Sequence, residues 1–375
     1  MKRYIFLIIF IPYIFLHSQV FTIADKYPIF FTLNTTVSST SNLYNVEKDV
    51  TETVTTLSPS LMLDLSNVAS YLNFNVSVSS QFKKYQKNDN FDKSYPTISS
   101  FASYSFPKSS IGSSVSFTQM ASEGDDPLDD GEAGKLLARD ITTFSINASH
   151  QISQKFSIQT SYSLTRTDQA ASNSSLDRDS FSVPFNLFYN YSLKSALGIG
   201  LRYTRESYDE IDDPEKYYIY LKLKGEISPK LLADSSIGYT INDSTSGKES
   251  NIGANINFTH LYSQKARFRF ALSRSFTPRA TGDEVLDTAL TIAGSYNFSA
   301  FISVSTSGNY RISKYIGTKD RKDESRSING SLNYNFTPKV SFSGSLSYRE
   351  NSSSGSKKGA NYKSNGVTFS ANFKF

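Results

Sequence analysis

The chain has 375 residues, of which 38% are hydrophobic, 14% are aromatic and none is cysteine; its formal net charge is +5 and its mean hydropathy is -0.35. So low an apolar content is poorly suited to a thick conventional core, and the many Tyr and Phe side chains argue against disorder. The absence of cysteine excludes disulfides, thiolate metal sites, thiol nucleophiles and a lipidated amino terminus.

The first 24 residues have the organisation of a secretory signal peptide. Met1-Lys2-Arg3 precede an apolar run over 4–16, and Pro12 within this run disfavours a permanent membrane helix. We predict cleavage after Ser18 or after Ala24, which leaves 25–375 as the mature domain. Loss of Lys2 and Arg3 lowers the formal charge from +5 to +3, so the charge gives no indication of a nucleic-acid partner.

Beyond the signal, apolar residues recur at every second position in runs of about 10 to 14 residues, which is the period of a strand with one apolar face. Short turns and longer polar segments alternate between the runs, so the repeating unit is a hairpin. The predicted strands cover 29–39, 51–65, 70–83, 94–106, 110–121, 140–152, 155–167, 180–192, 195–208, 216–228, 230–242, 250–262, 265–277, 285–298, 300–314, 325–336, 339–350 and 365–375.

The short turns share a sequence motif in which a lysine follows a Ser or Thr. It occurs at 105–108, 153–155, 192–194, 228–230, 263–265 and 337–339, with Phe298-Ser299-Ala300 as a variant. Neighbouring turns lie about 35 to 47 residues apart, which is two strands and one loop. A propeller would need four short strands per repeat, so hairpins of two long strands disfavour it.

The last strand, 365–375, predicts how the sheet closes. Val367, Phe369, Ala371, Phe373 and Phe375 fall on one face of it, with Thr, Ser, Asn and Lys on the other. Strict alternation that ends on an aromatic resembles the closing strand of a bacterial outer-membrane barrel. We therefore predict that Phe369, Phe373 and Phe375 form a C-terminal assembly signal for the barrel-assembly machinery.

These patterns predict an all-β fold, a single transmembrane antiparallel up-and-down β-barrel of about 18 strands, with 16 or 20 as alternatives. Short periplasmic turns and longer extracellular loops connect the strands. The expected location is the outer membrane of a Gram-negative bacterium, in contact with lipid and lipopolysaccharide.

The positions of the charged residues support this assignment of faces, since an outward Lys or Arg at mid-bilayer would cost about 2 to 4 kcal/mol. A barrel of this size is roughly 35 Å across, and inward Ser, Thr, Asn and Gly cannot fill it, so the lumen should hold water. The predicted lumen-lining charged residues are Arg202, Lys222, Lys224, Glu226, Asp234, Arg267 and Arg269. The alternation places Asp64 on the inward face as well.

Two interpretations of these charges stay open. The cations form a stripe that orients polar or anionic solutes, or they pair with the acidic residues and only stabilise the wall. The predicted lumen aromatic residues either stack on sugar rings or narrow the pore: Phe101, Phe188, Tyr218 and Tyr220.

The alternation along the strands places three arginines, Arg166, Arg205 and Arg274, on the outward face near the extracellular ends of their strands. Guanidinium binds phosphate bidentately, so we predict contact with lipopolysaccharide there. Water around these positions is the alternative.

Catalytic, metal and cofactor motifs are not recognisable, and we expect no cofactor and no enzymatic activity. The acidic segment 123–132 does not fit an EF-hand because Leu128 stands where a ligand is needed, so we interpret it as a solvated loop, like 209–213 and 319–324. His150 and His260 occupy equivalent outward positions at the predicted membrane boundary, as Tyr189 and Tyr334 do in other repeats, which favours an interfacial girdle over Ser-His chemistry.

The amino-terminal part resembles the β-barrel porin type-2 family. The resemblance rests on Ser41-Asn42-Leu43-Tyr44, on Leu57-Ser58-Pro59-Ser60-Leu61 and on Ser/Tyr-rich hairpins with Ser-Pro-Lys-like turns, and it spans nearly the whole mature chain. Thr40 and Ser60 depart from the family pattern, which has Asp and Gly at these places.

What the resemblance implies is a non-enzymatic outer-membrane channel that takes part in export of exopolysaccharide or capsule, with a periplasmic polysaccharide-export protein as a partner. A general diffusion porin for small polar solutes is the first alternative. A surface adhesin or structural barrel is the second.

Overall fold

The computed structural model describes residues 21–23, 27–43, 45, 47, 50–66, 71–89, 92–122, 137–169, 177–209, 213–244, 247–279, 283–317, 320–357 and 359–375. Both predicted cleavage positions, after Ser18 and after Ala24, and the acidic segment 123–132 lie outside these ranges. No helix long and apolar enough to cross a membrane occurs among the residues described.

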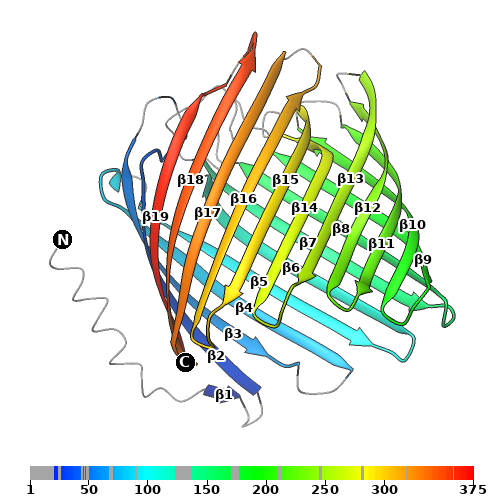
Figure 1. Ribbon diagram of the computed structural model, residues 1–375, viewed down its shortest axis with the longest axis horizontal. Coiled ribbons are helices and arrows are strands. Elements are labelled where there is room, and N and C mark those ends of the chain that lie inside the picture. The colour runs from blue at the N-terminus through cyan, green and yellow to red at the C-terminus, as the bar shows by residue number, and fades with distance from the viewer. Residues whose placement is uncertain are drawn as a thin grey trace.

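The sheet contains nineteen strands, and eighteen of them, β2 to β19, form a closed ring (Figure 1). Each strand pairs antiparallel with its neighbours in the chain, and β19 pairs with β2 to close the wall. The strands are β1 (Phe21–Ile23), β2 (Tyr27–Thr40), β3 (Glu52–Asp64), β4 (Leu72–Tyr85), β5 (Lys93–Ser105), β6 (Ser109–Ser122), β7 (Leu137–Gln151), β8 (Phe156–Gln169), β9 (Arg178–Asn190), β10 (Ser195–Tyr208), β11 (Glu215–Ser228), β12 (Leu231–Ser244), β13 (Gly247–Leu261), β14 (Ala266–Pro278), β15 (Glu284–Asn297), β16 (Ile302–Tyr315), β17 (Arg321–Thr337), β18 (Val340–Gly355) and β19 (Tyr362–Lys374).

The predicted fold class is confirmed, and each of the eighteen predicted ranges overlaps one strand of the ring. The short strand β1 was not predicted; it pairs with β2 at Tyr27 to Ile29. The prediction of a solvated charged loop over 319–324 was wrong for 321–324, where β17 begins and pairs with Ser352 to Gly355 of β18. This end of the ladder is polar, so the alternation of apolar residues gave no signal for it.

Apolar side chains cover the outside of the ring. Along β10 and β11 the outward residues Leu197, Ile199, Ile219 and Leu221 are all more than half exposed, while the residues between them are polar or glycine. A row of exposed Leu and Ile on a closed sheet is stable only against lipid. The protein is therefore an integral outer-membrane β-barrel.

Aromatic rings mark both boundaries of this apolar surface. Near the short turns, Phe156 packs against Tyr189 and Tyr262 against Phe268, with ring centroids 5.5 and 6.4 Å apart. Near the longer loops a row of outward rings crosses five strands, in the order Phe144, Tyr162, Phe181, Tyr203 and Tyr217. Rings with a polar tip suit the two membrane interfaces.

The shared sequence motif of the short turns has a structural reason. The side-chain oxygen of Ser153, Ser192, Ser263 or Thr337 accepts a hydrogen bond from the amide of the lysine two residues later, at 3.1 to 3.2 Å. Ser299 does the same for Phe301 in the turn without lysine. Local bonds of this kind stabilise a tight reversal, so each Ser or Thr fixes its turn.

The seam between β19 and β2 is closed by apolar packing as well as by the ladder. Leu33, Ala371 and Phe373 form a buried cluster, and the ring of Phe375 lies 5.6 Å from that of Phe31. The amide of Phe375 donates to the carbonyl of Phe31 at 2.8 Å. The last residue of the chain is thus part of the closed wall.

Candidate functional site

The middle of the inner wall is lined by hydroxyl groups that satisfy one another across neighbouring strands. Pairs such as Ser77–Ser99, Ser114–Ser145 and Ser305–Ser331 have oxygens 2.7 Å apart. Such pairs keep short polar side chains flat against the sheet. The wall therefore offers a polar surface with little bulk.

Five cations project from this wall in the half of the barrel formed by β10 to β14. Lys222 lies 3.5 Å from Asp234, and Arg269 donates to Asn257 at 2.8 Å. Arg202 lies over the ring of Tyr220, with the guanidinium carbon 5.9 Å from the centroid. Among the residues that the structure describes, no ion pair engages Arg202, Lys224, Arg267 or Arg269.

Glu226 is engaged elsewhere. It lies at a bulge of β11 next to Gly225, whose φ of 114° is open to glycine but strained for other residues. Its carboxylate pairs with Lys194 of the β9–β10 turn at 2.8 Å. The acidic neighbours therefore balance only part of the positive charge of the stripe.

The predicted lumen aromatic residues pack onto the wall. Tyr218 and Tyr220 are stacked with centroids 4.5 Å apart, and the Tyr220 hydroxyl donates to Asn186 Oδ1 at 2.7 Å. A Cβ on Gly200 would lie 2.4 Å from the Tyr220 ring, and one on Gly198 would lie 2.7 Å from the Phe188 ring. The glycines make room for rings that lie flat and buried.

Phe101 lies on another part of the wall. It pairs with Asn75 and Ser114 in the ladder, and it has the same parity as Ser99, whose hydroxyl bonds Ser77. Its side chain is half-buried.

Two grooves follow the cationic part of the lumen. One has a volume of about 320 Å³ and is lined by Arg267 and Arg269 together with Ser, Thr, Gly, Ala and Asn of β15 to β18. The other, about 140 Å³, is lined by Arg311, Asp323, Arg349, Asn351 and further polar residues of β16 to β19. Both combine guanidinium with hydroxyl and amide groups, which suits a carboxylate that also carries hydroxyls.

The wall separates on the side of the longer loops between β13 and β14. Their ladder ends at Ala254 and Arg274, whereas β13 continues to Gly247 beside β12, and β14 continues to Pro278 beside β15. In Figure 1 the upper end of β13 extends beyond the upper ends of β14 and β15. Glu284 to Asp287 are all buried, so both faces of this strand end are covered. We call residues 275–279 and 283–287 the β14–β15 tip.

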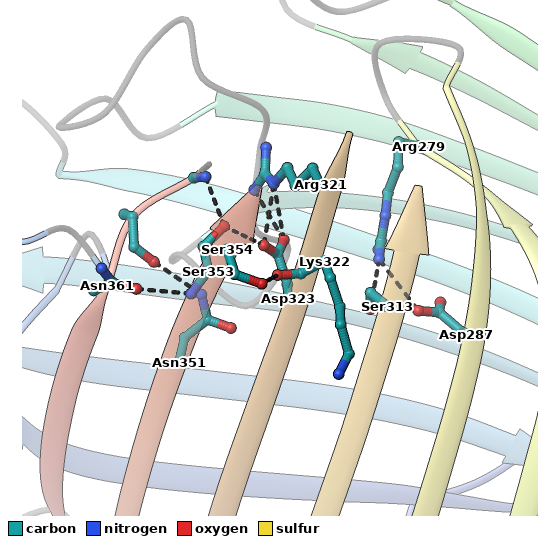
Figure 2. A network of polar contacts seen from close by, with 12 residues as sticks. Arg279, Asp287, Ser313, Arg321, Lys322, Asp323, Asn351, Ser353, Ser354 and Asn361 are labelled. Atoms are coloured by element: carbon teal, nitrogen blue, oxygen red, sulfur yellow. Dashed lines mark hydrogen bonds and ion pairs between the residues drawn. The ribbon is translucent and has the colours of Figure 1, made fainter. Parts of the chain in front are cut away.

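A polar network holds the base of this tip. Asp287 accepts a hydrogen bond from Arg279 at 3.4 Å (Figure 2). It also accepts from Arg311 Nε at 3.1 Å and from Ser313 at 2.5 Å. Charge-assisted bonds from two guanidinium groups are among the stronger contacts of a protein. The tip is therefore anchored to β16.

A second network lies on the adjacent strands. Arg321 donates to both oxygens of Asp323 at 3.1 Å, and its guanidinium lies 4.6 Å from the centroid of Tyr315. Asp323 also accepts from Ser353, which is bonded by the amide of Gly359 (Figure 2). Sequence analysis missed both networks because charges near strand ends can lie in loops, where parity predicts nothing.

At its far end the β14–β15 tip reaches β11, which is four strands away along the wall. Lys216 Nζ lies 3.0 Å from Glu284 Oε1 and 3.9 Å from Glu206 Oε1, and Arg178 Nε lies 3.7 Å from Glu206 Oε2. Lys216, Glu206 and Glu284 are less than a tenth exposed. We call these four residues the Lys216 cluster. They belong to β9, β10, β11 and β15.

The outward arginines have partners within the protein. Arg166 pairs with Asp168 at 2.8 Å and Arg205 with Asp213 at 2.7 Å. Arg274 lies where β13 and β14 separate, and it bonds Asn251 of β13 at 3.0 Å and Thr288 of β15 at 3.3 Å. Phosphate contact at these three residues stays a prediction, and it would compete with these partners.

The histidines lie at the predicted boundary positions. Ser109 Oγ is 2.8 Å from His150 Nδ1 on the exposed outer surface, and His260 packs its ring against Tyr262. Within the described ranges no carboxylate pairs with His150, and no group of three or more His, Cys, Asp or Glu is arranged to hold a metal. A serine and a histidine without an orienting third group lack the arrangement of a hydrolytic site.

The geometry defines the class: a closed, outer-membrane β-barrel of eighteen strands with a polar lumen. The fold is similar to solved structures of outer-membrane proteins from Pseudomonas aeruginosa. OccK2 (OpdF) in complex with glucuronate superposes with a TM-score of 0.54 at 10% identity over 94% of this chain and 99% of that one. OpdK superposes with 0.52 at 11% identity over 94% and 99%, and OpdQ with 0.52 at 10% identity over 93% and 99%.

These likenesses show the porin-type barrel fold. No family model matches the chain, and no curated protein matches it in sequence.

Proposed function

We propose that this protein is a diffusion channel of the outer membrane for small polar solutes, with a preference for solutes that carry a carboxylate. The observation that supports this best is the excess of cations on the inner wall, where Arg202, Arg267 and Arg269 have no acidic partner among the described residues. Cations in a narrow polar channel attract anions, and the surrounding hydroxyls replace part of a solute's hydration.

The similar barrels favour diffusion over polysaccharide export. They include OccK2, whose structure holds glucuronate, a hydroxylated carboxylate of the kind that the two grooves suit. Export of exopolysaccharide rests on the sequence resemblance alone, and so does a periplasmic export partner. Deletion of the gene should therefore leave surface polysaccharide intact while slowing uptake of small carboxylates; loss of the polysaccharide would favour export instead.

The anion preference is tested by the reversal potential across planar bilayers in a salt gradient. Replacing Arg202, Arg267 and Arg269 by Gln should shift the reversal potential toward that of a cation-preferring pore. A matched variant replaces Lys314, Lys322 and Lys363, which lie on the outer face of β16, β17 and β19, and it should leave the potential unchanged. Equal potentials for all three proteins would eliminate the anion preference, and a purified barrel that conducts no ions would eliminate the channel itself.

A further inference from the structure

We propose that the β14–β15 tip is a movable constriction of the lumen, and that the Lys216 cluster is the latch that holds it closed. This inference goes beyond the proposed solute preference. It rests on the proposed channel only for its effect on conductance, because the position of the tip is measurable without conduction.

The contact between Lys216 and Glu284 cannot be made along the wall. From β11 to β15 there are four strand spacings, which is roughly 19 Å, whereas a lysine and a glutamate side chain together reach roughly 10 Å. The observed Nζ–Oε1 distance is 3.0 Å. The beginning of β15 must therefore lie inward of the circle of the wall, toward β11, together with the end of β16, to which it stays paired at Val285 and Tyr315.

The end of the β13–β14 ladder is what permits this movement. Above Ala254 and Arg274 the two strands share no ladder pairs, so the tip can move together with the end of β16, to which it stays paired, without breaking a bond between β13 and β14. Arg274 bridges the point of separation through Asn251 and Thr288. The unpaired part of β13, 247–253, is polar except for Ile252, which suits a strand edge outside the hydrocarbon of a membrane.

The two ends of the tip differ in how well their polar groups are satisfied. At the base, Asp287 accepts bonds from Arg279, Arg311 and Ser313, and Phe276, Leu286 and Ile316 form a buried apolar cluster. At the far end, Lys216 is the partner of Glu284 Oε1, and Glu206 Oε2 and Glu284 Oε2 accept no hydrogen bond in the described part of the chain.

A further polar group beside the latch is buried without a partner. Asn242 of β12 is fully buried, and neither its Nδ2 nor its Oδ1 is bonded within the described residues. Buried polar groups without partners oppose a closed contact, and water would satisfy them once the tip withdrew. The base is therefore a fixed hinge, and the Lys216 cluster is a contact that opens at small cost.

A single reporter cysteine tests the latch, because the chain contains no other cysteine. Val285 is fully buried in the tip, so Val285→Cys should react slowly with a membrane-impermeant maleimide. Adding Lys216→Met should raise the labelling rate about tenfold or more, because the tip then spends more time open. An unchanged rate would overturn the latch.

Val54→Cys is the matched control. Val54 is 4% exposed and lies in a separate buried cluster with Leu43 and Tyr85, so Lys216→Met should leave its labelling rate unchanged. If both reporters became equally reactive, Lys216 would only stabilise the whole barrel, and the proposal would be wrong.

Conductance then tests whether the tip constricts the lumen. Lys216→Met and Glu284→Gln should each raise the mean single-channel conductance about twofold or more, and the double variant should do no more than either. Lys363→Met, which removes an exposed outer-face pair with Glu350, should have no effect. Faster labelling of Val285→Cys without a rise in conductance would show that the tip moves but does not constrict. A wild-type barrel without conductance would refute the proposed function and leave the labelling result to decide the latch.

Discussion

Replacement of Glu52 is expected to loosen the β4–β5 connection at the mouth of the barrel. Glu52 is fully buried, and its Oε1 accepts bonds from the amides of Gln86 at 3.0 Å and Lys87 at 3.1 Å, while its Oε2 accepts from Asn88 Nδ2 at 2.5 Å. The Gln86 amide also donates to the carbonyl of Thr53. The amide of Thr53 donates to Oε1 as well, at 2.8 Å. Glu52→Ala therefore leaves three donors without an acceptor, the amides of Thr53 and Lys87 and the side chain of Asn88.

At about 1 kcal/mol for each of the three lost bonds, this change should destabilise the local structure by about 3 kcal/mol. Local opening then becomes about 100-fold more frequent, since 1.4 kcal/mol is a factor of ten. The assay is the initial rate of trypsin cleavage after Lys87, followed by mass spectrometry of the folded barrel in lipid.

Glu52→Gln is the control that refines the test. Its Oε1 can still accept from the amides of Thr53, Gln86 and Lys87. Asn88 can turn its own amide to present oxygen to the new NH2 group. The cleavage rate should therefore rise less than about threefold. Cleavage of Glu52→Ala at the wild-type rate, or equal rates for Ala and Gln, would refute the assignment of these bonds.

Three further outcomes are expected. Phe375→Asp should reduce the amount of heat-modifiable folded barrel, because the Phe375 ring packs on Phe31 at the seam. Lys374→Gln, at the neighbouring position on the other face of β19, should leave that amount unchanged. Normal folding of Phe375→Asp would refute the assembly signal. Gly238→Ala should lower the free energy of unfolding, measured in urea, by about 1 to 3 kcal/mol, because the new Cβ would lie 2.0 Å from the Ile219 carbonyl oxygen. Gly308→Ala should lower this free energy less, because no atom lies within 4 Å of the new Cβ. Equal losses for the two variants would contradict the packing argument. In the segment between β10 and β11, burial raises the pKa of Asp213, but bonds from Arg205, Ser207 and the Tyr208 amide outweigh it and lower that pKa below 3.8. Because the folded-state pKa of Asp213 lies below the unfolded-state value, its stabilising effect is complete above the unfolded-state pKa and is lost as pH falls through the folded-state pKa. Hydrogen exchange of the Tyr208 amide, corrected for the intrinsic pH dependence of exchange, should therefore accelerate below about pH 4. The same acceleration in Asp213→Asn would contradict this.

The architecture followed from the sequence because the backbone of a β-strand points successive side chains to opposite faces of the sheet. Alternating residues such as Leu197, Ile199 and Leu201 identify the lipid face wherever they occur, and each repeated Ser or Thr before a lysine marks a tight turn. Even the strand number and the closing of β19 on β2 were predictable, since a barrel in a membrane cannot leave an edge unpaired.

The alternation also predicts Arg202, Lys222, Arg267 and Arg269 on the inner wall, but it says nothing about their partners. Which groups meet across a lumen depends on where the ring separates and how far a strand end leaves it. Lys216 and Glu284 are 68 positions and four strands apart, and no local pattern relates them. The sequence alone therefore determined the barrel and the polarity of its two faces. Only the tertiary structure decided that the β14–β15 tip leans inward to β11 and which charges hold it there, because that arrangement depends on contacts between strands that are not neighbours.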